Sequence, residues 1–320
     1  MMHLVRQART ALKRALLGEP DLPQQCTVGM RDPQSEVRVS LHGLGDPRDV
    51  THSHLVACAA PTIVGIGFDG GVKPEMNERT MLSLKFHERE GEERLLAEIG
   101  IRFSAMVRSS GQELFLFEIS ACQNHCLPKT RRWARSLHRE YLLWRSNKTS
   151  DVRMSSLGSR SMGVFFICPR PVVLVSVVDG DAGNMFPMNL MGSIGNGYFA
   201  FALNSSRPAS ALVERSGRVA LSSIPVEQAS LTRQLGRNHR QESVDWNQLP
   251  FSTKTSPALG IPAPAFALRV REMQIEAARK LGSHTLFMAH VIRDEIWAEG
   301  LQFFMVHGVY QKWRQTEERT

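Results

Sequence analysis

The sequence predicts a mainly β protein with short helices, of the α+β class, divided into two domains. Short apolar runs recur through both halves, and turns containing Gly or Asp separate them. A length of 320 residues is enough for two domains, each with its own hydrophobic core. A polar stretch rich in Ser and Gly, residues 146–163, separates the halves. We therefore expect one domain over residues 1–150 and a second over residues 151–320.

The first domain is predicted to consist mostly of strands and to end in a basic helix. Apolar periodicity predicts strands over residues 36–43, 62–71, 80–88 and 113–120, whereas residues 95–107 fit a helix or a strand. Leucine and alanine at helical spacing predict a helix over residues 1–17. The strand content would permit a second barrel, although the sequence shows no internal repeat. No motif assigns this domain a role.

The predicted basic helix, residues 129–148, has an apolar stripe and a separate arginine face. The stripe contains Trp133, Leu137, Tyr141 and Trp144. Such a helix can bind nucleic acid or a membrane surface, or it can cover a hydrophobic core. Because the aromatic residues share one stripe and do not alternate with the arginines, we expect them to pack into the core.

The second domain is predicted to be built from short antiparallel strands with few helices. Its expected strands cover residues 164–169, 197–203, 218–225, 266–277 and 285–292, with a hairpin over 171–183. Its expected helices cover residues 209–217, ending at Gly217, and residues 229–239. This pattern favours a closed or nearly closed β-barrel.

The composition predicts a protein of the reducing cytoplasm without a metal centre. The five cysteines are an odd number and lack the spacing of a disulfide framework. Cys122 and Cys126 flank His125, but this spacing is not that of a zinc knuckle, and we expect free thiols. No run of about 18 apolar residues is present, so we expect no membrane-spanning helix.

The stretch ALNSSRPASALVER, residues 202–215, reads as the end of a strand, a polar loop and the start of a helix. A serine of the loop could cap the helix, because Ser is a favoured cap residue and Pro208 suits the first turn. Alternatively, the free amides of that turn, the hydroxyls and the fork of Arg207 could bind a phosphate. This stretch alone does not decide between the two.

Four segments in this order resemble the flavin reductase-like family, whose fold is the FMN-binding split β-barrel. They are Arg170-Pro-Val-Val-Leu-Val-Ser-Val, Asn184-Met-Phe-Pro-Met-Asn, Ser206-Arg-Pro-Ala-Ser and Gly282-Ser-His-Thr-Leu-Phe. The resemblance covers roughly residues 160–312, about half of the chain. It is more specific for the fold and for flavin binding than for the reaction.

The resemblance implies roles for ten residues. It places Pro187, Met188, Asn189 and Leu190 along the flavin ring system, and His284 near the flavin face where a nicotinamide could stack. It implies that the FMN phosphate is held by Asn204, Ser205, Ser206, Arg207 and Ser210. The sequence departs from the family pattern at Asn189, where Ser or Thr is usual, at Ala209, where an acid is frequent, and at Ser283, where many relatives have Asp. The last departure puts the orientation of His284 in question.

The function implied by the resemblance is an FMN-binding oxidoreductase, an NAD(P)H-dependent flavin reductase that transfers hydride to flavin and pairs as a homodimer. FMN is the expected cofactor and NAD(P)H the co-substrate. The alternative is a non-catalytic flavin-binding sensor or carrier whose N-terminal domain gives the output. The space near His284 distinguishes them, because a catalyst needs an open flavin face there, whereas residues 1–150 could cover it in a sensor.

Overall fold

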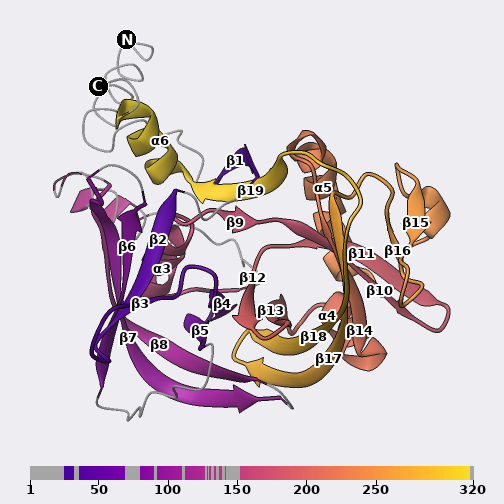
Figure 1. The fold of residues 1–320 in the computed structure, drawn as a ribbon, viewed down its shortest axis with the longest axis horizontal. Coiled ribbons are helices and arrows are strands. Elements are labelled where there is room, and N and C mark those ends of the chain that lie inside the picture. Colours follow the sequence, from indigo (N-terminus) through magenta and orange to yellow (C-terminus); the bar gives the residue numbers. More distant parts are fainter. Residues whose placement is uncertain are drawn as a thin grey trace.

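A computed structural model of the chain describes residues 25–31, 36–68, 80–89, 92–109, 112–126, 128, 130, 133–134, 137–138, 141 and 152–317. The predicted helix over residues 1–17 and Trp144 of the predicted basic helix lie outside these residues. Figure 1 shows the two halves of the chain side by side, the N-terminal half in indigo and magenta and the C-terminal half in pink, orange and yellow.

The N-terminal half is built on a seven-stranded antiparallel sheet. In chain order its strands are β2 (Val37–His42), β3 (Arg48–Asp49), β4 (His54–Cys58), β5 (Ile63–Gly67), β6 (Met81–Glu88), β7 (Leu95–Arg108) and β8 (Glu113–Asn124). In space they run β3-β2-β6-β7-β8-β5-β4. The segment that fitted a helix or a strand is therefore a strand, β7, because its two long neighbours β6 and β8 supply both ladders.

The C-terminal half is built on a second seven-stranded antiparallel sheet. Its strands are β10 (Val173–Asp179), β11 (Ala182–Met188), β12 (Met191–Gly195), β13 (Tyr198–Asn204), β14 (Arg218–Ser223), β17 (Arg269–Leu281) and β18 (His284–Ile296). They run β11-β10-β14-β17-β18-β13-β12. If the seven strands of each sheet are numbered 1 to 7 in chain order, both sheets have the same spatial order, 2-1-5-6-7-4-3.

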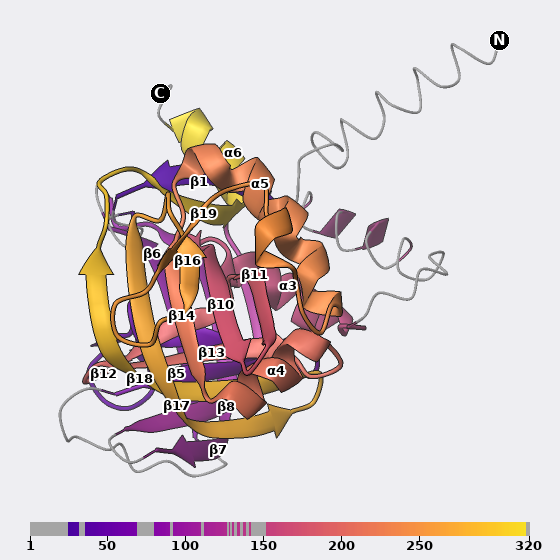
Figure 2. The same cartoon turned by 90° about the vertical axis from the view of Figure 1, so that its right-hand side faces the viewer.

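Short helices and minor strands complete the C-terminal half. They are α4 (Pro208–Ser216), η2 (Val226–Gln228), α5 (Ala229–Gln234), η3 (Leu235–Arg240), η4 (Trp246–Gln248), β15 (Thr253–Thr255) and β16 (Pro262–Pro264). Helix α4 buries Ala209, Leu212 and Val213 in the core of the C-terminal sheet and ends at Gly217, which has the left-handed φ of 63°. Figure 2 shows α5 and α4 near the edge of this sheet that β11 forms.

Segments from each half also complete the other half. Helix α3 (Ser156–Phe165) and the C-terminal helix α6 (Gly308–Glu317) both bury residues in the N-terminal core. Strand β1 (Gln25–Met30) pairs with β19 (Gln302–His307), which also pairs with β9 (Arg170–Pro171). The small sheet β1-β19-β9 runs across both halves at the top of Figure 1.

The two halves meet through a shared hydrophobic core. The N-terminal sheet contributes Leu55, Ala57, Cys58, Ile63, Val107, Leu114 and Leu116, and the C-terminal sheet contributes Ile194, Tyr198, Ala200, Leu281, Leu286 and Met288. All of these side chains are buried, most of them completely. Such an apolar, continuous contact fixes the two sheets relative to each other.

The prediction of a mainly β chain with short helices is confirmed, but two local predictions are wrong. Residues 164–169, predicted as a strand, contain the end of α3 and the turn after it. Their apolar run is buried because the last turn of this helix packs into the N-terminal core. Trp133, Leu137 and Tyr141, predicted to pack into the core, are 69%, 46% and 47% exposed.

Candidate functional site

The loop between β13 and α4 does not cap the helix with a serine. Strand β13 ends at Asn204, and the N-cap residue of α4 is Arg207, whose side chain makes no capping hydrogen bond. The backbone N–H and the hydroxyl of Ser206 both donate to Asn204 Oδ1, at 2.9 and 2.8 Å. The capping alternative is therefore wrong, and the amides of the first turn of α4 have no side-chain cap.

Two arginines and a histidine lie at the amino end of α4. Burial, and then the charge of Arg240 on η3, lower the pKa of Arg207, so the two guanidinium groups are close enough to repel each other. His239 Nε2 lies 2.7 Å from the carbonyl oxygen of Pro187, and burial lowers the pKa of His239. A neutral His239 donates this hydrogen bond, and Arg207 and Arg240 bring two positive charges to this end of the helix.

Hydroxyl groups join this loop to the turn between β17 and β18. Ser205 N donates to Ser283 O at 3.1 Å, and Thr285 Oγ1 donates to Ser205 Oγ at 3.2 Å. Asn204 pairs with His284 in the ladder between β13 and β18. Ser210 is buried in the first turn of α4. The structure thus brings the predicted phosphate residues and His284 into one region.

The predicted flavin strip, Pro187 to Leu190, connects the two halves of the chain. Met188 ends β11 and packs in the core of the C-terminal sheet, whereas Leu190 packs against the N-terminal core. Asn189 Nδ2 lies 3.6 Å from Met305 Sδ on β19. Of the four side chains, only that of Asn189 carries hydrogen-bonding groups for the polar edge of a ring system.

His284 is buried and neutral at pH 7. Its side chain is 6% exposed, and burial lowers its pKa to about 4. Nδ1 lies 2.8 Å from Ser283 Oγ and 3.5 Å from the backbone nitrogen of Ala59. Because Nδ1 accepts these hydrogen bonds, the proton of the neutral ring belongs on Nε2. Nε2–H is a hydrogen-bond donor, but the ring is not a general acid at neutral pH.

The N-terminal half covers the turn that carries His284. Ser283 N donates to Ala60 O at 2.9 Å, and Ala60 N donates to Ser283 Oγ at 3.1 Å. The thiol of Cys58 donates to Leu281 O at 2.6 Å. Residues Cys58 to Ala60, at the end of β4 and in the turn after it, thus form a wall beside His284. Residue patterns could not reveal this wall, because Ala59 and His284 are 225 positions apart.

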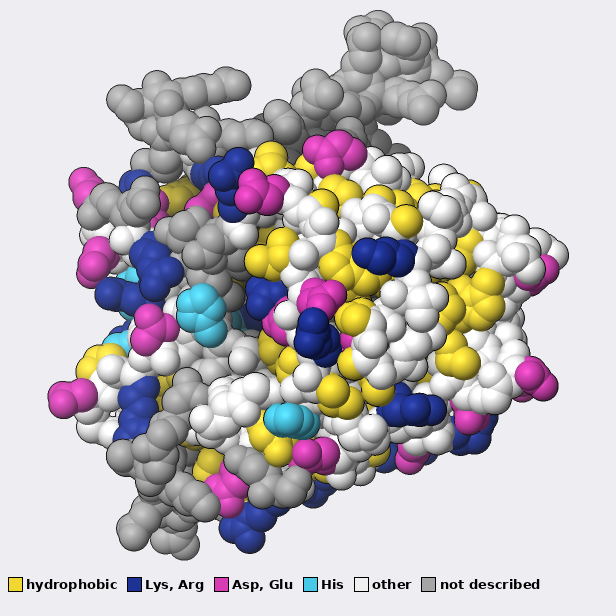
Figure 3. Space-filling view, turned by 45° about the vertical axis from the view of Figure 1, so that its right-hand side comes forward, with side chains coloured by type: hydrophobic (Ala, Val, Ile, Leu, Met, Phe, Trp, Pro, Cys, Tyr) yellow, Lys and Arg dark blue, Asp and Glu magenta, His cyan; other side chains and the backbone are white. Residues whose placement is uncertain are grey.

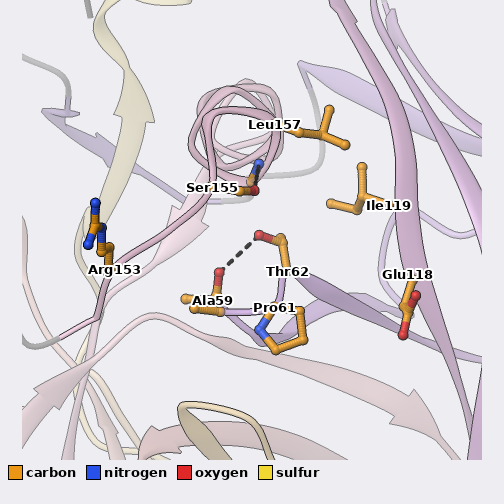
Figure 4. Close-up of a pocket in the computed structure, with 10 residues that line it drawn as sticks. Ala59, Pro61, Thr62, Glu118, Ile119, Arg153, Ser155 and Leu157 are labelled. Carbon is orange, nitrogen blue, oxygen red and sulfur yellow. Dashed lines mark hydrogen bonds between the residues drawn. The ribbon is translucent and has the colours of Figure 1, made fainter. Parts of the chain in front are cut away.

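A cavity of about 420 Å³ lies against this wall and the amino end of α3 (Figure 4). Ala59, Ala60 and Pro61 line it together with the charged residues Arg153 and Glu118. Thr62 Oγ1 donates to Ala59 O at 2.9 Å, and Ser155 Oγ accepts from Gly158 N at 3.0 Å. None of the ten predicted site residues lines this cavity, although Ala59 and Ala60, which line it, also bond to His284 and Ser283.

Other candidate sites find little support in the described part of the chain. There, no three His, Cys, Asp or Glu side chains are placed to hold a metal ion. Cys126 Sγ donates to Leu96 O, and His54 is bonded to Val50 O and to Arg170. No helix among the described residues is long and apolar enough to cross a membrane. On the face in Figure 3, basic side chains are spread among acidic and apolar ones.

Comparison with known proteins supports the resemblance for the C-terminal half. Residues 165–313 match the family model described as flavin reductase like domain. An FMN-binding protein from Thermus thermophilus is 22% identical, with 40% of this chain and 71% of that chain covered and a TM-score of 0.37. An NADH:FAD oxidoreductase from Streptomyces globisporus is 19% identical, with 47% and 89% covered and a TM-score of 0.42.

The flavin reductase of a styrene monooxygenase from Pseudomonas putida is 17% identical, with 46% of this chain and 92% of that chain covered and a TM-score of 0.38. No curated protein matches the chain. By the family match, residues 165–313 of this chain form a flavin reductase like domain.

Proposed function

We propose that this chain is an FMN-binding oxidoreductase, a flavin reductase that uses NAD(P)H. The observation that carries the proposal is the amino end of α4, which no side chain caps and where Arg207 and Arg240 repel each other. Helix amides, a cationic fork and nearby hydroxyls are the donors that a phosphate prefers. In a flavin reductase like domain, we assign this site to the phosphate of FMN.

The residues of the chain would hold and orient the cofactor, whereas the flavin, once bound, supplies the hydride and electron-transfer chemistry. Arg207, Ser205 and Ser210 would bind the phosphate. Asn189 would bond the polar edge of the ring system, with Met188 packed beneath it. His284, which is neutral at pH 7, would donate a hydrogen bond from Nε2 and would transfer no proton.

The burial of His284 favours a second candidate function, a non-catalytic flavin-binding sensor or carrier. A nicotinamide that stacks on the flavin needs an open face, and Cys58 to Ala60 cover the turn that carries His284. If this wall stays closed, flavin binds but NAD(P)H does not reach it. The two candidates share the phosphate site and differ only in access to the ring.

A cytoplasmic location stays a prediction, and the homodimer that the resemblance implies has a competing alternative, a single chain. The N-terminal sheet already supplies each C-terminal sheet with a partner inside the same chain, through the shared core of the two halves. Light scattering after gel filtration measures the number of chains per particle.

The experiment that tests the proposal is an FMN titration of the purified full chain, followed anaerobically by NADH and then NADPH. We expect the flavin absorbance band to shift on binding and to bleach with one of the nucleotides. Binding without bleaching by either nucleotide would favour the sensor or carrier. An unchanged flavin spectrum at every protein concentration would refute both candidates.

A further inference from the structure

The two sheets agree in detail as well as in strand order. In both, the long hairpin of the sixth and seventh strands has two register shifts. At each shift, one residue has no partner on the opposite strand. In the β7–β8 hairpin these unpartnered residues are Ser120 on β8 and Ser104 on β7. In β17–β18 they are Ile292 on the second strand and Glu276 on the first. Because β-bulges redirect a strand at defined positions, the same pair of bulges gives both hairpins the same bend.

This agreement makes Gln112 the counterpart of His284. Gln112 directly precedes Glu113, which pairs with Arg108 where β7 ends, and His284 directly precedes Thr285, which pairs with Lys280 near the end of β17. Counted from the bulges, the two residues occupy the same place in their hairpins. Both are buried, at 8% and 6% exposed.

The two halves contact each other reciprocally through these residues. His284 Nδ1 accepts from Ala59 N, between β4 and β5 of the N-terminal sheet. Gln112 Nε2 donates to Ile194 O near the end of β12, and Gln112 Oε1 accepts from Asn196 Nδ2 at 3.0 Å, in the equivalent turn between β12 and β13. Each sheet therefore walls the hairpin turn of the other, as in a dimer built within one chain.

The chemistry of the two halves has diverged at these matched positions. In the C-terminal half, Asn204 ends β13 and Ser205, Ser206 and Arg207 follow it, whereas the stretch FDGGVKPEMNER that follows β5 contains no Ser or Thr and has three acidic and two basic residues. The amide of Gln112 is engaged at both of its polar atoms, whereas His284 keeps Nε2–H without a hydrogen bond to any described residue. Hydroxyls and a guanidinium together favour a phosphate, and the N-terminal stretch offers no hydroxyl.

We propose that each chain binds a single flavin, at the C-terminal sheet, and that the N-terminal sheet serves as the fixed second wall of that site. The inference rests on the proposed function and extends it, because it assigns the N-terminal half a task. Since the second wall comes from the same chain, a monomer holds a complete site.

The test is the stoichiometry of FMN on the full chain, measured by titration together with particle mass by light scattering. We expect one FMN per chain on a particle of one chain. Arg207→Ala should weaken FMN binding about ten- to hundredfold, because a charge-assisted hydrogen bond to phosphate is lost. Ser283→Ala, which removes the acceptor of Ala60 N from the wall, should weaken it about tenfold.

Asn196→Gly is the matched control at the equivalent turn of the C-terminal half. Asn196 has a φ of 52°, which glycine adopts readily, and the change removes only its bond to Gln112. We expect one FMN at unchanged affinity. Two FMN per chain, one FMN per two chains, or equal weakening by Asn196→Gly and Ser283→Ala would overturn the inference alone. No FMN binding by the unmodified chain would refute the proposed function first.

Discussion

Replacing His284 with glutamine should protect the protein against acid. In the folded chain burial lowers the pKa of His284 to about 4, from an ordinary value of 6.5. Between these two pH values the unfolded chain binds a proton that the folded chain does not, so stability is lost as the pH falls. For this one group the loss is about 2 kcal/mol at pH 5 and about 3 kcal/mol at pH 4.

Glutamine does not titrate, and its amide oxygen can accept the hydrogen bond that Nδ1 accepts from Ala59 N. We therefore expect His284→Gln to match the unmodified chain at pH 7.5 and to exceed it by about 2 kcal/mol at pH 5. Urea unfolding followed by tryptophan fluorescence at several pH values measures this difference. Other histidines whose pKa values are lowered by burial, among them His54 and His239, add to the acid sensitivity that remains.

His290→Gln, at an exposed position of the same strand, controls for the substitution itself. Parallel stability curves for His284→Gln and the unmodified chain from pH 7.5 to pH 4.5 would refute the reasoning. They would mean that the ring is solvated in solution and that the wall formed by Cys58 to Ala60 stands open.

Three further predictions follow from other contacts. His284→Ala should slow the bleaching of bound flavin by NADH or NADPH while leaving FMN affinity within about threefold; loss of FMN would instead make His284 a binding residue. Gly67→Ala should lower stability by about 1–3 kcal/mol in thermal unfolding, because a Cβ there would lie 2.7 Å from Ile194 O across the contact between the halves. Glu272→Ala should lower the free energy of unfolding in urea by about 3 kcal/mol, because this buried carboxylate accepts hydrogen bonds from Ser256, Ala258 and Leu259. An unchanged unfolding midpoint would contradict this expectation.

The sequence predicted the helices and strands whose ends are marked by a nearby turn residue. The hairpin of β10 and β11 and the end of α4 at Gly217 each depend on a turn residue with positive φ next to a periodic run. The error at residues 164–169 has the opposite origin. A short apolar run fits a buried strand or a buried helix end equally well, and Ser155, which caps α3, lay in the polar stretch that we interpreted as a boundary.

Features that depend on distant pairing could not be predicted. The alternation of residues along a strand shows that one face is buried, but it does not show which strand lies beside it. The strand order that the two halves share therefore could not be recognised in the sequence, which shows no internal repeat. His239 ended a predicted helix and Arg240 lay just beyond it, and only the packing of η3 places them beside Pro187 and Arg207.

The contrast between Gln112 and His284 bears most directly on what the N-terminal half does. Both side chains seal the contact between the halves, and a glutamine does so without retaining an ionisable ring. If sealing were the only requirement, an amide would serve at both places and would avoid the loss of stability in acid that burying a histidine brings. A histidine at only one of the two places therefore indicates a task there besides sealing. It pairs with Asn204 in the ladder and directly precedes Thr285, which donates to Ser205, in the half that has the loop suited to phosphate.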